Sequence, residues 1–217
     1  MTCSCAPDEQ GSRPITEHIR IANCTGFFCD RPSGALEMVE GGPIDVLTGD
    51  WLAELTMLIL SRIRAKRPGH GYARTFVGQM EQVMGTCMEK GIKVVSNAGG
   101  LDPDGCAEAV KDVADNLGLN PTIAYVNGDD LLPRIPELAP SGALKPFAGS
   151  SDVTPLGNLD AYASANASLA PFGIVDARTR VADVVSTGHV PDAAVLSVPS
   201  AWHLGWPRTD SDPPCCL

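Results

Sequence analysis

The sequence has few aromatic residues, few positive charges and no long hydrophobic run. Aromatic residues make up 5% of its 217 positions, and 16 Lys and Arg stand against 26 Asp and Glu, which gives a net charge of -10 at pH 7. An acidic protein binds the phosphates of nucleic acids and anionic membrane surfaces poorly. The longest apolar stretch, Leu52 to Leu60, contains Glu54 and is too short to span a bilayer. We therefore expect neither nucleic acid nor membrane as a partner.

Several common functional motifs are missing as well. Residues 1–18 are polar and lack the hydrophobic segment of a signal peptide, which indicates a cytoplasmic protein. The chain contains no G-x-x-x-x-G-K-[ST] phosphate loop, no G-x-G-x-x-G after its first expected strand and no G-x-S-x-G nucleophile elbow. These absences disfavour a nucleotide-driven enzyme and a serine hydrolase. No cofactor is predicted.

The chain does contain eight cysteines. Because there is no secretion signal, they are interpreted as thiols rather than as a disulfide framework. Cys24 and Cys29 are too far apart for a typical metal knuckle and no matching pair follows, so no metal site is predicted. Either cysteine could act as a nucleophile in a loop near a helix N-terminus, but no partner histidine can be named.

Short apolar runs alternate along the chain with segments of helical period. The expected strands are residues 19–22, 44–47, 92–96, 122–126 and 183–186. The expected helices are residues 33–39, 51–63, 76–90, 103–117, 161–178 and 195–204. Residues 1–18 are expected to be a disordered tail and residues 133–160 a long loop. The alternation predicts a three-layer α/β fold, with a mostly parallel sheet of about five strands and helices on both faces.

Each expected strand is followed by polar residues and glycine. The carboxyl ends of parallel strands meet at one edge of a sheet, where α/β proteins bind their ligands. Glycines let the backbone approach a ligand, and helix N-termini at that edge favour an anionic group. The predicted substrate-binding residues are Asn23, Thr25, Gly26, Asn97, Gly99, Gly100, Gly128, Gly188, His189 and Asp192. The predicted acid–base residues are Asp50, Asp129 and Asp130.

Several of these residues have a simpler interpretation. Asp50 and Asp102 are each favoured as a helix cap over a catalyst. Gly128 and Gly188 could be ordinary turn glycines, and His189 could be a solvated loop residue. Convergence of five similar strand ends still favours a pocket at this edge.

Two further residue groups have competing interpretations. The adjacent Asp129 and Asp130 could coordinate a hard cation, but their side chains point different ways and no third ligand is identifiable. His203 lies between Trp202 and Trp206 in the sequence. It is expected to pack against the indoles rather than to act in catalysis.

Long segments of the chain resemble the acyclic terpene utilisation (AtuA-like) family. They are IRIANCTGFF (19–28), DRP (30–32), GPIDVLTGD (42–50), LAELT (52–56), VVSNAGGL (94–101), GDDLL (128–132) and AWHLGW (201–206). The resemblance covers about residues 19–206 and implies an α/β domain of a cytosolic bacterial or fungal protein. It also implies a part in the catabolism of citronellol- and geraniol-type terpenes through CoA thioesters.

The chain departs from the family pattern at three places. Cys29 stands where the pattern has glycine, and His189 and Pro191 stand where it has arginine and threonine. If that arginine holds an anionic group, a histidine would hold it less firmly. From residue 207 the sequence diverges, so residues 207–217 are expected to be a divergent tail and the chain a truncated family member.

The resemblance therefore favours an enzyme-type domain acting on a small carboxylate or acyl-CoA, as a lyase or hydratase. Two alternatives stay open. One is a non-catalytic binding or assembly subunit, for example in a homo-oligomer. The other is an inactive fragment that lacks its C-terminal half and leaves apolar surface uncovered.

Overall fold

The computed structural model describes residues 18–140, 162–170 and 172–205. Five strands form one parallel sheet in the order β1-β2-β3-β5-β4. The strands are β1 (Ile21–Asn23), β2 (Val46–Gly49), β3 (Lys93–Ser96), β4 (Ile123–Val126) and β5 (Val184–Thr187). All five expected strands are present within two residues of their predicted bounds, and the predicted α/β class is confirmed.

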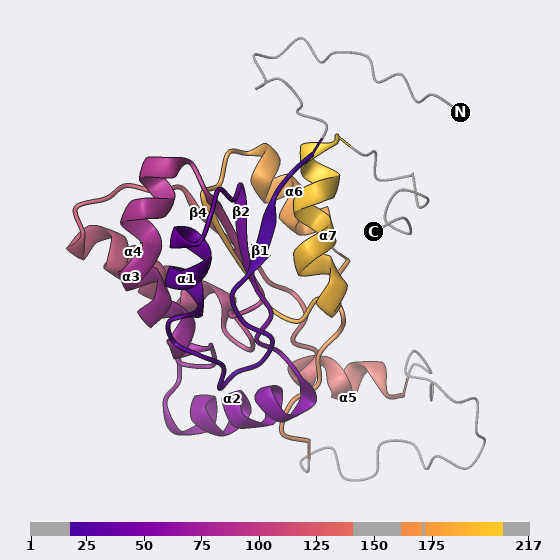
Figure 1. Ribbon diagram of the computed structural model, residues 1–217. Coiled ribbons are helices and arrows are strands. Elements are labelled where there is room, and N and C mark those ends of the chain that lie inside the picture. The colour runs from indigo at the N-terminus through magenta and orange to yellow at the C-terminus, as the bar shows by residue number, and fades with distance from the viewer. Residues whose placement is uncertain (1–17, 141–161, 171, 206–217) are drawn as a thin grey trace, which may run out of the picture.

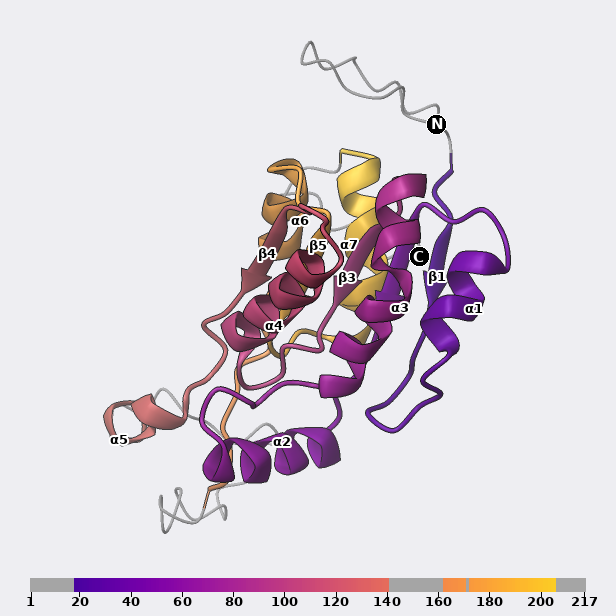
Figure 2. The ribbon, with the colours of Figure 1, turned by 90° about the vertical axis from the view of Figure 1, so that its left-hand side faces the viewer.

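Helices cover both faces of this sheet. The helices of the described residues are α1 (Gly34–Glu40), α2 (Glu54–Lys66), α3 (Arg74–Lys90), α4 (Pro103–Asn116), the 3-10 turn η1 (Leu132–Arg134), α5 (Ile135–Leu138), α6 (Phe172–Thr179) and α7 (Asp192–His203). Helices α1, α3 and α4 pack on one face, and α6 and α7 pack on the other (Figure 1, Figure 2). Helix α2 instead lies across the carboxyl ends of the strands. No helix in the described residues is both long and apolar enough to cross a membrane.

Each of the three central strands has two consecutive buried apolar residues, because both faces of the sheet are covered there. Leu47 of β2 and Val94 of β3 pack with Phe76 on the side of α1, α3 and α4. The neighbouring residues in sequence point the other way, and Val95 packs with Val185 under α6 and α7. Each strand thus contributes alternately to two hydrophobic clusters, and the sheet separates them.

The helix boundaries differ from the predictions at one polar residue and agree at another. Asp50 is not the N-cap of α2, because the helix begins at Glu54 and Ala53 occupies the cap position. Asp102 is the N-cap of α4, as predicted. Its side chain accepts a hydrogen bond from the backbone N–H of Gly105 at 3.3 Å, and Pro103 is the first helical residue.

The predicted helix over residues 161–178 is wrong in its first half. In the described stretch 162–170, backbone groups bond to other loops instead of to one another. Ala165 O accepts from Leu131 N at 2.7 Å, and Ala167 N donates to Asp129 O at 2.8 Å. The helical part is α6, from Phe172. Residues 1–17, most of the predicted 133–160 loop and residues 206–217 lie outside the described residues.

The close contact between the loop after β3 and the end of β5 gives a test of this packing. A Cβ at Gly99 would lie 2.8 Å from Pro103 Cα and 2.9 Å from Ser186 Oγ. We expect Gly99→Ala to lower the free energy of unfolding by about 1–3 kcal/mol, measured by urea denaturation.

Gly85, in the interior of α3, is the matched control because a Cβ there meets nothing within 4 Å. Gly85→Ala should raise the free energy of unfolding by up to about 1 kcal/mol, since alanine is the better helix former. Equal effects of the two substitutions would contradict the packing described for Gly99.

Candidate functional site

A cavity of about 290 Å³ lies at the carboxyl edge of the sheet, next to the start of α2. The residues that line it are Leu52, Ala53, Glu54, Met57, Ser164, Asn166, His189 and Asp192. One wall is largely apolar and comes from α2 and the turn before it. The other wall is polar and comes from the segment 162–170, the loop after β5 and the first turn of α7. The cavity is therefore at the edge where the sequence predicted a pocket, and it includes two of the predicted residues.

Asp50, which follows β2, is half-buried beside this cavity. Its Oδ1 accepts a hydrogen bond of 2.6 Å from the Asn97 amide and a longer one of 3.4 Å from the backbone N–H of Leu52. Burial raises the pKa of Asp50 above its ordinary value, and the negative charge of Asp192 raises it further, although Asn97, Leu52 N–H and His189 act to lower it. Asp50 does not line the cavity, but it interacts electrostatically with two residues that do.

Asn97 was predicted to bind substrate, but its side chain is buried and bonds to other residues of the protein. Its side chain is completely buried, its Nδ2 donates to Asp50 and its Oδ1 accepts from the backbone N–H of Trp51 at 2.7 Å. The amide therefore joins the end of β3 to the turn that follows β2. Both of its polar atoms are used within the protein, so it positions Asp50 rather than presenting an open donor to the cavity.

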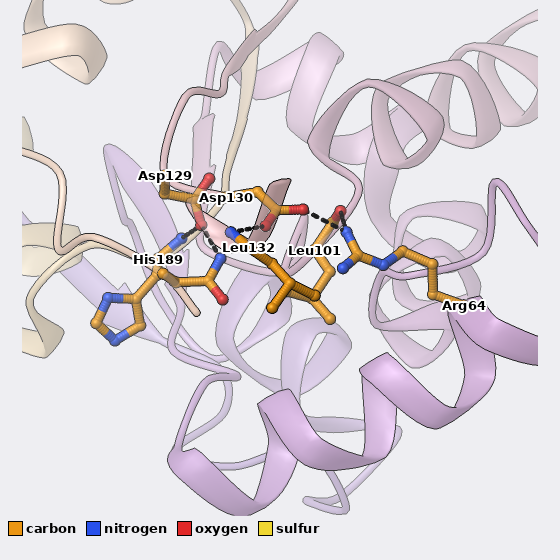
Figure 3. Close-up of polar contacts among 7 residues, drawn as sticks. Arg64, Leu101, Asp129, Asp130, Leu132 and His189 are labelled. Atoms are coloured by element: carbon orange, nitrogen blue, oxygen red, sulfur yellow. Dashed lines mark hydrogen bonds and ion pairs between the residues drawn. The ribbon is translucent and has the colours of Figure 1, made fainter. Parts of the chain in front are cut away.

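Asp129 is the buried member of the Asp129-Asp130 pair, with 2% of its surface exposed. Its Oδ2 accepts from Asn166 Nδ2 at 2.7 Å and from the backbone N–H of His189 at 3.0 Å. Figure 3 shows the Asp129 carboxylate against the His189 backbone. A Cβ at Gly188 would lie within 2.7 Å of Asp129 Oδ2, so only glycine fits there. Asp129 thus positions two residues that line the cavity.

Asp130 points to the other side and binds α2. Its Oδ2 is 2.7 Å from Arg64 Nη1, and its Oδ1 accepts from the backbone N–H of Leu132 at 3.0 Å. The same Arg64 nitrogen donates to Leu101 O at 3.1 Å (Figure 3). Arg64 therefore ties α2 to the loops after β3 and β4. Asp130 does not line the cavity.

The predicted residues after β1 form a local loop and do not line the cavity. Asn23 Nδ2 donates to Thr25 O at 2.8 Å, and Thr25 Oγ1 donates to Phe27 O at 3.0 Å. Gly26 N donates to Asp30 Oδ2 at 3.0 Å. These bonds hold the chain as it leaves the outermost strand on this side of the sheet.

The predicted glycines after β3 and β4 are needed for close packing or for the backbone conformation of the turn. Gly99 is packed against Pro103 and Ser186, as described above. Gly100 has a φ of +54°, and a Cβ there would lie 2.9 Å from Gly71 O. Gly128 has a φ of +109° with nothing within 4 Å of a Cβ, which fits a turn glycine. None of the three lines the cavity.

The structure also bears on the cysteine, metal and histidine alternatives. Burial raises the pKa of the Cys24 thiol to about 12, which disfavours the thiolate a nucleophile needs. Cys29 is exposed. Within the described ranges, no three His, Cys, Asp or Glu residues form a group that could hold a metal ion. His203 lies edge-on to the indole of Trp202 with ring centroids 6.3 Å apart, as expected, while Trp206 is outside the described residues.

Sequence reasoning missed six of the eight residues that line the cavity, because only His189 and Asp192 were among the predicted site residues. Ser164 and Asn166 lie in the stretch that was predicted to be helical, and no motif marked them. The other four, Leu52, Ala53, Glu54 and Met57, lie in the expected helix over residues 51–63, and none of them was predicted to line a site. Their place at the sheet edge depends on α2 lying across the strand ends, which the amphipathic pattern does not specify.

The fold and the cavity define the class as a parallel α/β protein with a ligand-sized cavity at the carboxyl edge of its sheet. The model of one protein family, described as "Acyclic terpene utilisation family protein AtuA", matches residues 19–213. Because the match covers most of the chain, this protein belongs to the acyclic terpene utilisation family, as the sequence resemblance indicated. No curated protein and no solved structure matches the chain. The boundaries of the predicted tails stay a prediction.

Asp129 is buried and Asp130 is partly exposed, so removing each carboxylate should lower the free energy of unfolding by a different amount. Asp129→Ala leaves the half-buried amide of Asn166 and the backbone N–H of His189 without their acceptor, and should lower the free energy of unfolding by about 2–5 kcal/mol. Asp130→Ala removes a partly exposed ion pair with Arg64 and should cost about 1 kcal/mol. Urea denaturation of the two variants tests this. Equal losses would contradict the roles given to the two residues.

The raised pKa of Asp50 predicts a pH dependence of stability. The folded state binds this proton more tightly than the unfolded state, whose aspartate pKa is about 3.9. Stability from this group is therefore fully present below the unfolded pKa and is lost as the pH rises through the folded pKa. Asp50→Asn removes that loss and keeps an acceptor for Asn97.

The free energy of unfolding of Asp50→Asn minus that of wild type should increase from acid to neutral pH and then level off. The control is Asp115→Asn, at an exposed carboxylate of α4 paired with Lys111. A difference for Asp50→Asn that falls with rising pH would show that the carboxylate is stabilised in its charged form.

Proposed function

We propose that this protein is an enzyme-type domain that transfers protons on a small carboxylate or acyl-CoA intermediate of terpenoid catabolism, in a lyase- or hydratase-type reaction. The observation that carries the proposal is the composition of the cavity. An apolar wall lies opposite His189 and Asp192, and Asp50 is within electrostatic range of both.

This chemistry needs two groups that can exchange protons. In a dehydration, a base removes the proton next to the carbonyl, the C=C bond forms, and the C–O bond breaks as an acid protonates the leaving hydroxyl to give water. Hydration is the reverse. The two candidates are His189, which lines the cavity, and Asp50, which does not line it and would exchange its proton through one water molecule. The surroundings of Asp50 favour the protonated carboxyl, and histidine is the usual acid–base residue at neutral pH.

The size of the cavity limits the part of a substrate that enters it. A volume of about 290 Å³ corresponds to roughly ten water molecules of about 30 Å³ each. That is enough for a small acyl group and too little for the nucleotide portion of CoA, which would lie outside. Membership of the acyclic terpene utilisation family supports the metabolic setting of the proposal.

Deuterium exchange into short branched acyl-CoA thioesters and their free acids tests the proposal. Incubation in D₂O should introduce deuterium next to the carbonyl, detected by mass spectrometry, even where no net reaction occurs. Asp50→Asn and His189→Gln should each slow the exchange by about 100-fold or more. Asp115→Asn, on the exposed surface of α4, should leave it at the wild-type rate. Absence of exchange with every acid and thioester would overturn the proposal.

One observation favours a second candidate, which is ligand binding without catalysis. The Nδ1 atom of His189 is buried and, within the described part of the chain, has no hydrogen-bond partner. A catalytic histidine usually has this nitrogen held by a carboxylate or a carbonyl. Thermal stabilisation by a ligand that shows no deuterium exchange would support this second candidate.

A further inference from the structure

The charges around the cavity indicate which form of an acyl ligand it accepts. We infer that the cavity selects the uncharged form, a thioester or ester, over the free carboxylate. This inference rests on the proposed function and narrows its substrate class from a carboxylate or acyl-CoA to the thioester.

Two carboxylates line the cavity, and each belongs to the first turn of a helix. Glu54 is the first residue of α2, and Asp192 is the first residue of α7. The cap positions before them, Ala53 and Pro191, provide no side-chain cap. The partial positive charge of each helix N-terminus is therefore complemented by the protein's own carboxylate. These helix ends do not offer a vacant site for an anion.

No fixed positive charge among the described residues of the lining offsets these carboxylates. The lining contains neither lysine nor arginine, and His189 is its one basic residue. Arg64, at the same sheet edge, is already bound to Asp130 and to Leu101 O. The mutual influence of the carboxylates is visible in Asp50, whose pKa is raised partly by Asp192. An entering carboxylate would add another like charge.

The rest of the lining suits an uncharged acyl group. Leu52 and Met57 offer apolar surface for the hydrocarbon part. The Ser164 hydroxyl can donate to a carbonyl oxygen, and the Asn166 amide has a second N–H besides the one donated to Asp129. Neutral donors of this kind bind the oxygen of a thioester without requiring a compensating charge.

The test compares 3-methyl-2-butenoate with its N-acetylcysteamine thioester and its methyl ester, probes that lack the CoA phosphates. Binding to the full chain is measured by titration calorimetry at neutral pH. Glu54 and Asp192 are exposed to water, so water weakens their repulsion of a bound carboxylate. We expect the two uncharged probes to bind about tenfold more tightly than the acid.

Neutralising either carboxylate of the cavity lining should reduce the ratio between the affinity of the uncharged probes and that of the acid. Glu54→Gln and Asp192→Asn should each reduce it by about threefold or more, because the acid then meets less repulsion. Asp115→Asn changes the net charge equally but is remote on α4, and should leave the ratio unchanged. Raising the salt concentration to about 0.5 M should also narrow the ratio through screening.

The outcomes separate this inference from the proposed function. Tighter binding of both uncharged probes, with a ratio that falls in the two lining variants, supports the inference. Equal or tighter binding of the acid overturns it and leaves the proposed function standing. If none of the three probes binds while the chain remains folded, the proposed function fails and the inference fails with it.

Discussion

The buried amide of Asn97 is the contact on which the carboxyl edge of the sheet depends. Its two bonds, to the Asp50 carboxylate and to Trp51 N–H, fix the chain as it leaves β2. That direction sends α2 across the strand ends instead of along a face of the sheet, and α2 then supplies the apolar wall of the cavity. The same bond sets the position of the carboxylate whose pKa is raised. The geometry of this edge therefore follows from one amide in the loop after β3.

The sequence was sufficient to predict the layers of the fold. Central parallel strands begin with consecutive β-branched or aliphatic residues because both of their faces are covered, as in the first two residues of β2 and of β5, and this pattern does not depend on the neighbouring loops. The cap at Asp102 was predictable as well, because a cap depends on neighbours within three residues. Both features arise from local chemistry, so a single sequence is enough to recognise them.

The site could be predicted as a location but not as a set of contacts. Asp129 and Asp130 are equivalent in sequence, yet one is buried under two donors and the other binds Arg64 at a half-exposed position. Asn97 was expected to face a ligand and instead faces Asp50. Asn166 was missed because local helical propensity was outweighed by backbone bonds to the loop after β4, formed across about 35 residues of chain. Such long-range pairings have no signature in the spacing of one sequence.

The single Asp129 oxygen that holds both Asn166 and the His189 backbone has a consequence for how the cavity can change. The residues Asn166 and His189 of the polar wall come from segments far apart in the sequence. Because both donate to Asp129 Oδ2, their positions depend on each other. A substitution of Asn166 would therefore change how firmly Asp129 holds the loop that carries His189. A change in that loop would likewise affect how Asp129 holds Asn166. In a double-mutant cycle, the effects of substitutions at these positions on the free energy of unfolding would not be additive. A change of specificity on this wall would accordingly have to arise through paired substitutions.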